Sequence, residues 1–345
     1  MDSMKLEDCC EILDSQRVPI TGSDRTSGDY PYYGANGIQD YVDDFIFDDE
    51  LVLLAEDGGN FGSKTRPIAY RVSGKCLVNN HAHVLKPKAG LDVDYLCYSL
   101  MFYDVGGMVN GATRQKLTQA AMRQMIIPKR SLDEQIEIVN IIKKVQGVIA
   151  SRKEELEQLD LLIKARFVEL FGDININDKN WKYEPLGELC TIVRGGSPRP
   201  IEQFLGGDVP WIKIGDATDG DSIYLNSTKE HIIQEGIKKS RLVKEGSLIF
   251  ANCGVSLGFA RIITFDGCIH DGWLAMEDID ERLDKVFLLQ ALNQMTEHFR
   301  AIAPAGTQPN LNTAIMKAYK QVIPPIELQR EFINFAKQVT KSKVV

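Results

Sequence analysis

The longest regular pattern in the chain is an apolar stripe through its middle. Ser131-Leu132-Asp133-Glu134 has the form of a capping box, in which the serine and the glutamate satisfy free N–H groups at a helix start. The heptad seam that follows is apolar at eight of its ten places, which are Ile138, Ile142, Val145, Ile149, Arg152, Leu156, Leu159, Ile163, Arg166 and Leu170. Gly172 offers a left-handed cap. The pattern predicts a helix over residues 131–171, about 60 Å long. Its single apolar stripe requires a partner helix.

Short apolar runs separated by glycine-containing turns lie on both sides of this helix. In the first half, strands are predicted at residues 49–55, 67–72 and 76–78, and a short helix at 94–103. In the second half, strands are predicted at residues 247–251, 259–263 and 268–269, and a helix at 284–295. The fold class expected is therefore α+β, with two mixed α/β globular domains separated by a long α-helix.

The two domains are diverged copies of one unit. Three pairs of segments carry the match: residues 6–12 with 186–192 at an offset of 180, residues 113–117 with 307–311 at an offset of 194, and Ile127-Pro128 with Ile323-Pro324 at an offset of 196. An offset that grows along the chain indicates loop insertions. A duplicated unit, each copy followed by a helix, predicts one kind of task carried out at two places.

The second copy is also followed by an amphipathic helix, which spans residues 327–345 after Pro324-Pro325. We expect this shorter helix to pack antiparallel on the central one, as in a coiled coil. At the offset of 196, Val345 corresponds to Ile149. We therefore expect Leu156, Leu159 and Ile163 to lack a full-length partner within the chain, and to be exposed or covered by another molecule.

These patterns divide the chain into residues 1–130, 131–172, 173–325 and 326–345, as first domain, central helix, second domain and short C-terminal helix. The composition, 44% hydrophobic and 26% charged, is that of an ordinary globular protein. No long apolar run and no signal peptide is visible, so a cytoplasmic location without membrane contact is expected. Seven cysteines without a C-x-x-C pair argue against a disulfide framework or a zinc finger.

The charge distribution is uneven. A net charge of -8 argues mildly against nucleic acid, which asks for a basic surface. Basic residues nevertheless gather in a few segments, which are Lys64/Arg66, Arg114/Lys116/Arg123, Arg194/Arg199 and Lys238/Lys239/Arg241/Lys244. A chain with basic loops on an acidic body can still meet a polyanion with one face.

Three segments match catalytic or ligand-binding motifs only in part. Residues 58–65 miss the last glycine of a phosphate-binding loop and lead into a strand-like run, where that loop needs a helix. His81-x-His83 has metal-ligand spacing, but no carboxylate or cysteine follows at a suitable distance. The only Pro-Pro, at 324–325, fits a helix entry better than a methyltransferase loop. We expect no catalytic site, no metal and no cofactor in this chain.

Five strings carry a family resemblance: YPYYGANGI at 30–38, EDGGNFGSK at 56–64, VNNHAHVLKP at 78–87, GATRQKLT at 111–118 and FGDININDKNW at 171–181. Taken with the repeat, they resemble the specificity subunit of type I restriction-modification systems over essentially the whole chain. The second domain matches less closely, with VPWIKIGDAT at 209–218 in place of the first string. It has His270-Asp271-Gly272-Trp273 where the first domain has NNHAH.

The resemblance implies a non-catalytic, DNA-reading subunit with two target recognition domains. In that family each domain reads one half of a split sequence in double-stranded DNA, and the helices bind modification subunits that methylate adenine. A restriction subunit joins them to form an ATP-dependent nuclease. A helix of about 60 Å matches roughly 17 base pairs of rise, as an upper bound on the spacing of the half-sites.

The candidate DNA contacts are loop residues whose side chains suit guanine, adenine or phosphate. In the first domain they are Lys64, Arg66, Asn79, Asn80, Arg114 and Lys116, and in the second Arg194, Ser197, Arg199, Lys213, Gln308 and Asn310. The competing interpretation is that they are solvated surface residues or turn formers. The candidate subunit contacts are Ile142, Val145, Ile149, Leu156, Leu159 and Ile163.

Two alternatives to this function remain open. One is a scaffold or adaptor that binds proteins through its long helix and has no DNA role. The other is a silent or recombining copy that stores a recognition domain without a working second helix. An enriched split DNA motif distinguishes the first alternative from a specificity subunit, and co-purification with modification subunits distinguishes the second.

Overall fold

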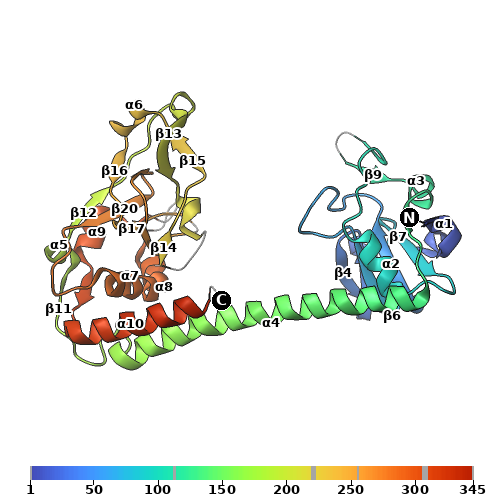
Figure 1. Ribbon diagram of the computed structural model, residues 1–345, viewed down its shortest axis with the longest axis horizontal. Helices are drawn as coiled ribbons and strands as arrows, with labels where there is room; N and C mark the ends of the chain where they lie inside the picture. Colours follow the sequence, from blue (N-terminus) through green and yellow to red (C-terminus); the bar gives the residue numbers. More distant parts are fainter. Residues whose placement is uncertain (1, 112–113, 219–222, 255, 305–309, 344–345) are drawn as a thin grey trace. The chain divides into compact units, whose positions relative to one another are not determined.

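The computed structural model describes residues 2–111, 114–218, 223–254, 256–304 and 310–343 (Figure 1). The chain forms two compact units, residues 1–152 and 153–345, and the boundary between them falls inside the long helix α4 (Leu132–Phe171). No helix in the described ranges has the length and the hydropathy needed to cross a membrane.

The first unit is built on a six-stranded sheet of order β2-β7-β5-β6-β3-β4. Its strands are β2 (Cys10–Ile12), β3 (Ser27–Gly34), β4 (Gly37–Val42), β5 (Phe47–Ala55), β6 (Ala69–Val78) and β7 (Ala82–Pro87). Around it lie β1 (Ser3–Lys5), α1 (Leu6–Cys9), two short 3-10 turns (Asp14–Gln16 and Gly22–Asp24), α2 (Val93–Leu100), β8 (Val109–Asn110), β9 (Lys116–Leu117), α3 (Gln119–Arg123) and β10 (Ile126–Pro128). All pairs in the sheet are antiparallel except β3 with β6.

The central strand β5 is buried on both of its faces. Val52 and Leu54 pack with Leu96 of α2 in one hydrophobic cluster, and Leu51 and Leu53 belong to another cluster on the opposite face. A strand covered on both faces reads as a continuous apolar run, which explains the sequence LVLLA at 51–55.

The second unit repeats this design with more elements. Its two sheets have the orders β12-β20-β17-β18-β14 and β15-β13-β19-β16. The strands are β12 (Thr191–Arg194), β13 (Leu205–Ile212), β14 (Tyr224–Leu225), β15 (Glu230–Ile232), β16 (Arg241–Val243), β17 (Leu248–Ala251), β18 (Ala260–Ile263), β19 (Gly267–Ile269) and β20 (Trp273–Glu277), with β11 (Tyr183–Pro185) paired to β21 (Lys320–Val322) outside them. The helices are α5 (Leu186–Leu189), α6 (Gln234–Ile237), α7 (Lys285–Gln294), α8 (Thr296–Ile302), α9 (Thr313–Ala318) and α10 (Ile326–Ser342), with 3-10 turns at Ile201–Gln203 and Ile214–Thr218.

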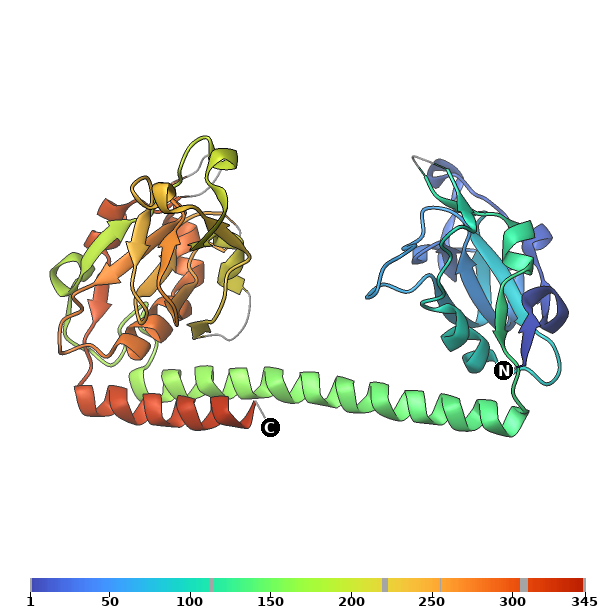
Figure 2. The same ribbon diagram turned by 45° about the horizontal axis from the view of Figure 1, so that its top comes forward.

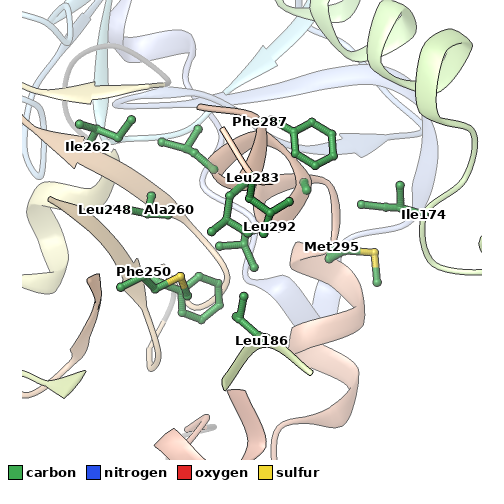
Figure 3. Close-up of a cluster of buried hydrophobic side chains, with 14 of the residues drawn as sticks. Ile174, Leu186, Leu248, Phe250, Ala260, Ile262, Leu283, Phe287, Leu292 and Met295 are labelled. Carbon is green, nitrogen blue, oxygen red and sulfur yellow. The ribbon is translucent and has the colours of Figure 1, made fainter. Parts of the chain in front are cut away.

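The core of the second unit lies between its larger sheet and α7. Leu248 and Phe250 of β17 and Ile262 of β18 belong to the same buried cluster as Phe287 and Leu292 of α7 (Figure 3). The predicted α+β class is therefore correct for both units.

Helix α4 begins as its sequence predicts. The Ser131 N–H donates to Glu134 Oε2 at 2.8 Å, and the Glu134 N–H donates to Ser131 Oγ at 3.3 Å, which completes the capping box. In the second unit α10 lies along the last part of α4 (Figure 2). Arg166 pairs with Glu331 at 2.6 Å and Asp160 with Lys343, so the two helices are antiparallel, as expected.

The expected exposure of the seam residues Leu156, Leu159 and Ile163 is wrong for Ile163. That side chain is 4% exposed in a cluster with Phe332 and Ala336 of α10, Leu159 packs against the same cluster, and Leu156 is partly exposed. The reason is that an antiparallel α10 begins opposite the end of α4 and covers that end first. Exposed apolar residues of α4 are found in both units: Ile141, Val145, Val148 and Ile149 lie in the first, and Leu161, Leu162 and Val168 in the second.

Strand pairing corrects the last repeat offset. Ser3 of β1 faces Pro128 of β10, and Tyr183 of β11 faces Val322 of β21. Since Ser3 and Tyr183 correspond at an offset of 180, Pro128 corresponds to Val322, which is an offset of 194 and not 196. The similar Ile-Pro strings at 127–128 and 323–324 are therefore not equivalent positions.

Candidate nucleic-acid interface

Both units bring the same three segments together at one edge of the sheet. In the first unit the Glu56 N–H donates to the His81 carbonyl at 2.9 Å, and the Leu117 N–H donates to the Glu56 carbonyl at 2.7 Å. Residue 56 follows β5, residue 81 lies in the turn between β6 and β7, and residue 117 ends β9. We call residues 56–58, 79–81 and 114–117 the loop edge of the first unit.

The second unit makes the same bonds with different residues. The Asn252 N–H donates to the Gly272 carbonyl at 2.9 Å, and the Leu311 N–H donates to the Asn252 carbonyl at 2.8 Å. Isolated bridges join Asp57 to Lys116 in the first unit and Cys253 to Asn310 in the second. Residues 252–254, 270–272 and 310–311 therefore form the equivalent loop edge, and the offset of 194 that matched 113–117 to 307–311 holds for the described part of these segments.

The turn of the first loop edge is held by Asn79. Its side chain is 3% exposed, its Oδ1 accepts the His81 N–H at 2.8 Å and its Nδ2 donates to Gln39 Oε1 at 2.9 Å. Its own N–H donates to the Tyr33 carbonyl. Asn79 therefore forms the turn and is not presented at the surface, whereas Asn80 beside it is exposed.

His270 takes the same place in the second unit. Its N–H donates to the Ile212 carbonyl at 3.0 Å, and its Nδ1 accepts the Gly272 N–H at 2.9 Å. Burial lowers the pKa of His270 more than the adjacent Asp271 carboxylate raises it. A neutral imidazole thus does in the second turn what the Asn79 amide does in the first.

Two basic candidates of the first unit pair with carboxylates, and two lie exposed in a loop. Arg114 Nη2 donates to Asp57 Oδ1 at 2.9 Å, and Lys116 Nζ lies 2.9 Å from Glu56 Oε1. The hydrogen bond to Glu56 raises the pKa of Lys116. Lys64 and Arg66 are exposed in the loop between β5 and β6. That loop continues into β6 and not into a helix, consistent with the rejection of a phosphate-binding loop.

Three candidates of the second unit converge on Asp271. Ser197 Oγ donates to Asp271 Oδ1 at 2.8 Å, and Arg194 Nε donates to the Asp271 carbonyl at 2.9 Å. Arg199 Nη2 lies 3.8 Å from Asp271 Oδ2 with its side chain 82% exposed. This set therefore belongs to the loop edge of the second unit, which sequence spacing alone did not show.

The remaining second-unit candidates are placed less uniformly. Lys213 Nζ pairs with Glu230 Oε1 at 2.6 Å, and Asn310 Oδ1 lies 3.3 Å from Asn252 Nδ2. Gln308 lies outside the described residues.

A buried charged cluster behind the first loop edge was missed by sequence reasoning. His83 Nδ1 lies 2.7 Å from Asp14 Oδ2 and its Nε2 lies 2.9 Å from the Leu117 carbonyl, while Arg17 Nη1 donates to Glu56 Oε2 at 2.5 Å. Burial raises the pKa of Asp14, but the hydrogen bond from His83 and other donors outweigh it and hold that pKa below its ordinary value. The cluster ties the end of β2 to β7 and to the segment after Lys116.

This cluster is a poor metal site although its residue types suit one. Asp14, Glu56 and His83 place potential ligand atoms within 4.8 Å of one another. The Arg17 guanidinium already supplies the positive charge there, and both imidazole nitrogens of His83 face acceptors within the chain. The arrangement stiffens the loop edge and offers no open coordination position.

The second unit has replaced this cluster. The registers of β2 with β7 and of β12 with β20 place Arg194 at the position of Asp14, and Leu274 at the position of His83. Asn252 stands at the position of Glu56. The two loop edges thus share a backbone framework and differ in charge and hydrogen-bonding groups.

Comparisons with known proteins show to which family the chain belongs. The family described as "Type I restriction modification DNA specificity domain" matches residues 1–161 and 178–344. A type I restriction enzyme specificity subunit of Haemophilus influenzae is 30% identical over 342 residues, covering 95% of this chain and 85% of the relative. The MjaIX specificity subunit of Methanocaldococcus jannaschii is 25% identical over 298 residues, covering 77% of this chain and 67% of the relative.

Solved structures show the same fold. The S subunit of a type I restriction-modification system from M. genitalium aligns with a TM-score of 0.57 at 15% identity, covering 99% of this chain and 90% of that one. A chain from a study of complex assembly and conformational transition in the type I system aligns with a TM-score of 0.61 at 16% identity, with the same coverage. With the family matched twice along the sequence, once on each unit, this chain belongs to the type I restriction-modification DNA specificity family.

Proposed function

We propose that this chain is the DNA sequence-specificity subunit of a type I restriction-modification complex, and that each unit reads one half of a bipartite site in double-stranded DNA. The observation that carries the proposal is the pair of loop edges, which share one set of backbone hydrogen bonds and carry different polar side chains. One framework with two chemistries is what two different half-sites require. The chain itself performs no catalysis in this proposal, in keeping with its relatives.

The exposed basic residues of the two loop edges are the proposed DNA contacts. Arg114 and Arg199 have side chains that are 58% and 82% exposed, and each lies beside a carboxylate that orients it. Lys64 and Arg66 in the neighbouring loop, and Asn80 at the turn, complete the first set. Asn79 is left out because its Oδ1 bonds to the His81 N–H and its Nδ2 to Gln39 of β4.

The helices are the proposed docking surface for adenine-methylating modification subunits, through which the restriction subunit joins. Support comes from the apolar residues of α4 in the first unit: Val145 is 53% exposed and Ile149 is 50% exposed. Leu156 is also partly exposed. Ile163 is buried against α10, so it does not belong to the proposed interface.

In the deciding experiment, the chain is co-expressed with modification subunits, and the purified complex is used to select bound duplexes from a random DNA library. Enrichment of a split motif is expected. A complex that assembles and enriches no motif would overturn DNA reading and favour a scaffold. A chain that fails to co-purify with the modification subunits would favour a silent copy.

Arg199→Ala tests the proposed interface directly. It should weaken DNA binding and lower the slope of log affinity against log salt by about 1, because one phosphate or base contact is lost. Lys182→Ala is the matched control, since its side chain is also well exposed, at 71%, and lies before β11, away from the loop edge. Equal effects from the two variants would argue against the assignment of Arg199.

A further inference from the structure

We propose that His81 determines specificity in the first recognition domain, and that Asp57 is the residue that positions it. The inference rests on the proposed function and adds a base-reading group of defined chemistry. His81 lies at the loop edge, in the turn between β6 and β7. Its imidazole ring, with the side chain 34% exposed, is the part of the residue that is open to a ligand.

The backbone of His81 is held on both sides. Its N–H donates to Asn79 Oδ1 at 2.8 Å, and its carbonyl accepts the Glu56 N–H at 2.9 Å. Asn79 is in turn fixed to Gln39 and Tyr33. A side chain on so constrained a turn loses little further freedom when it binds, which favours precise contact with a partner.

Asp57 fixes the ring and its tautomer. His81 Nδ1 lies 2.6 Å from Asp57 Oδ1. A carboxylate only accepts, so Nδ1 carries the proton and Nε2 keeps its lone pair in the neutral ring. No hydrogen bond to Nε2 is found within the described ranges of the chain. In its neutral form the ring therefore presents a single acceptor to a ligand at the loop edge.

A single acceptor selects the bases that carry an exocyclic amino group. In the major groove adenine offers its N6 amino group and cytosine its N4 amino group, whereas the edges of guanine and thymine offer acceptors. A neutral His81 therefore favours adenine or cytosine at one position of the first half-site.

Arg114 reaches the same carboxylate oxygen. Its Nη2 donates to Asp57 Oδ1 at 2.9 Å and lies against Gly58, where an added Cβ would stand 3.0 Å from that nitrogen. Asp57 thus holds the Arg114 guanidinium beside the His81 ring, which places a phosphate or guanine contact next to the proposed amino-group contact.

The second unit provides the internal contrast. The hydrogen bond from Glu56 to His81 is matched by that from Asn252 to Gly272, so a glycine stands where His81 does. The second loop edge has no ring at this position and relies on Arg194 and Arg199 around Asp271. The two units therefore share a backbone arrangement at this position, and only the first carries a side chain there that could read a base.

The test compares the motifs that the assembled complex selects from a random duplex library. His81→Ala should lower discrimination at one position of one half-site by about tenfold and leave the other half-site unchanged. Its salt slope should stay as in wild type, because a side chain that contacts a base edge neutralises no phosphate. His81→Gln should shift that position towards adenine, since an amide contacts adenine through two hydrogen bonds. Asp57→Asn should weaken the same preference, since the ring loses its fixed tautomer.

His231→Ala, which removes an exposed histidine from β15 of the second unit, is the matched control and should change nothing. The proposal is overturned if His81→Ala and His81→Gln, both folded by their thermal unfolding, select the wild-type motif with wild-type discrimination. Failure of the proposed function has a different signature, because the wild-type complex itself would then select no split motif.

Discussion

A buried glutamine anchors the start of each of the helices α4 and α10, and the two residues make the same set of three hydrogen bonds. Gln135 Nε2 donates to the carbonyls of Gly90 and Arg130, and its Oε1 accepts the Asp92 N–H at 2.8 Å. Gln329 makes the equivalent bonds to Arg282, Pro324 and Asp284. Both side chains are fully buried. Each glutamine thus satisfies loop groups that precede α2 or α7, and ties them to the first turns of α4 or α10.

Replacing Gln135 by alanine should lower the stability of the first unit by about 1–3 kcal/mol, because two carbonyls and one N–H lose their partner in a partly buried site. Gln329→Ala should have the same effect on the second unit. The measurement is chemical unfolding of the full chain followed by probes in each unit. Gln146→Ala, which removes only an exposed hydrogen bond to Tyr98, is the control. A loss no larger than that of the control would show that water replaces the glutamine.

Residue-level reasoning from sequence failed at these positions for a physical reason. A glutamine near a helix start carries no apolar signal, so its burial is decided by loop carbonyls 45 and 5 residues away. The cluster of Asp14, Glu56 and His83 is similar, since its members come from three separate segments that only the folded sheet brings together. The exposed basic loop residues could be predicted, because a charged residue in a glycine-containing loop is expected at the surface from its own neighbours in the sequence.

At the scale of elements, α4 exposes several large apolar side chains in the part that belongs to the first unit. Ile141, Val145 and Val148 are 54%, 53% and 69% exposed, and their spacing of three and four residues puts them on one face. The same helix is covered by α10 at its end, where Phe167 and Phe171 are buried. Helix α4 is thus covered by α10 at its end and exposes an apolar face in the first unit.

Val145→Lys should therefore weaken co-purification with modification subunits at least tenfold, because a charge would enter an apolar contact. The fold should be unaffected, since the side chain is exposed in the chain alone. Asn140→Lys, an exposed polar position on the same helix, is the matched control. Wild-type assembly of the Val145 variant, measured by titration of the modification subunits, would remove this stretch from the interface.

Element prediction succeeded where the signal is local. The capping box and the heptad seam specified α4 to within one residue at its start, because caps and side-chain periodicity act over a few residues. The final repeat offset was wrong by two residues, because the pairing of β11 with β21 and not the similar Ile-Pro strings sets the register. Strand register depends on partners far along the chain, which a single sequence does not reveal.

At the scale of the whole molecule, the two units have separate cores and separate loop edges. The hydrogen bonds of His81 and Arg114 run to Asp57 within the first unit, and those of Arg194 and Ser197 run to Asp271 within the second. Substitutions in different units should therefore act independently on DNA binding. Sites that share no partners have free-energy effects that add to within about 0.5 kcal/mol.

Arg114→Ala should relax recognition of one half-site and Arg199→Ala that of the other, and the loss of binding free energy in the double variant should equal the sum of the two single losses. The measurement is the affinity of each assembled complex for duplexes in which one half-site at a time is scrambled. Against a duplex whose first half-site is scrambled, Arg114→Ala should cost little more, while Arg199→Ala keeps its full effect. A coupling well above 0.5 kcal/mol, or both variants acting on the same half-site, would show that the units do not read DNA separately.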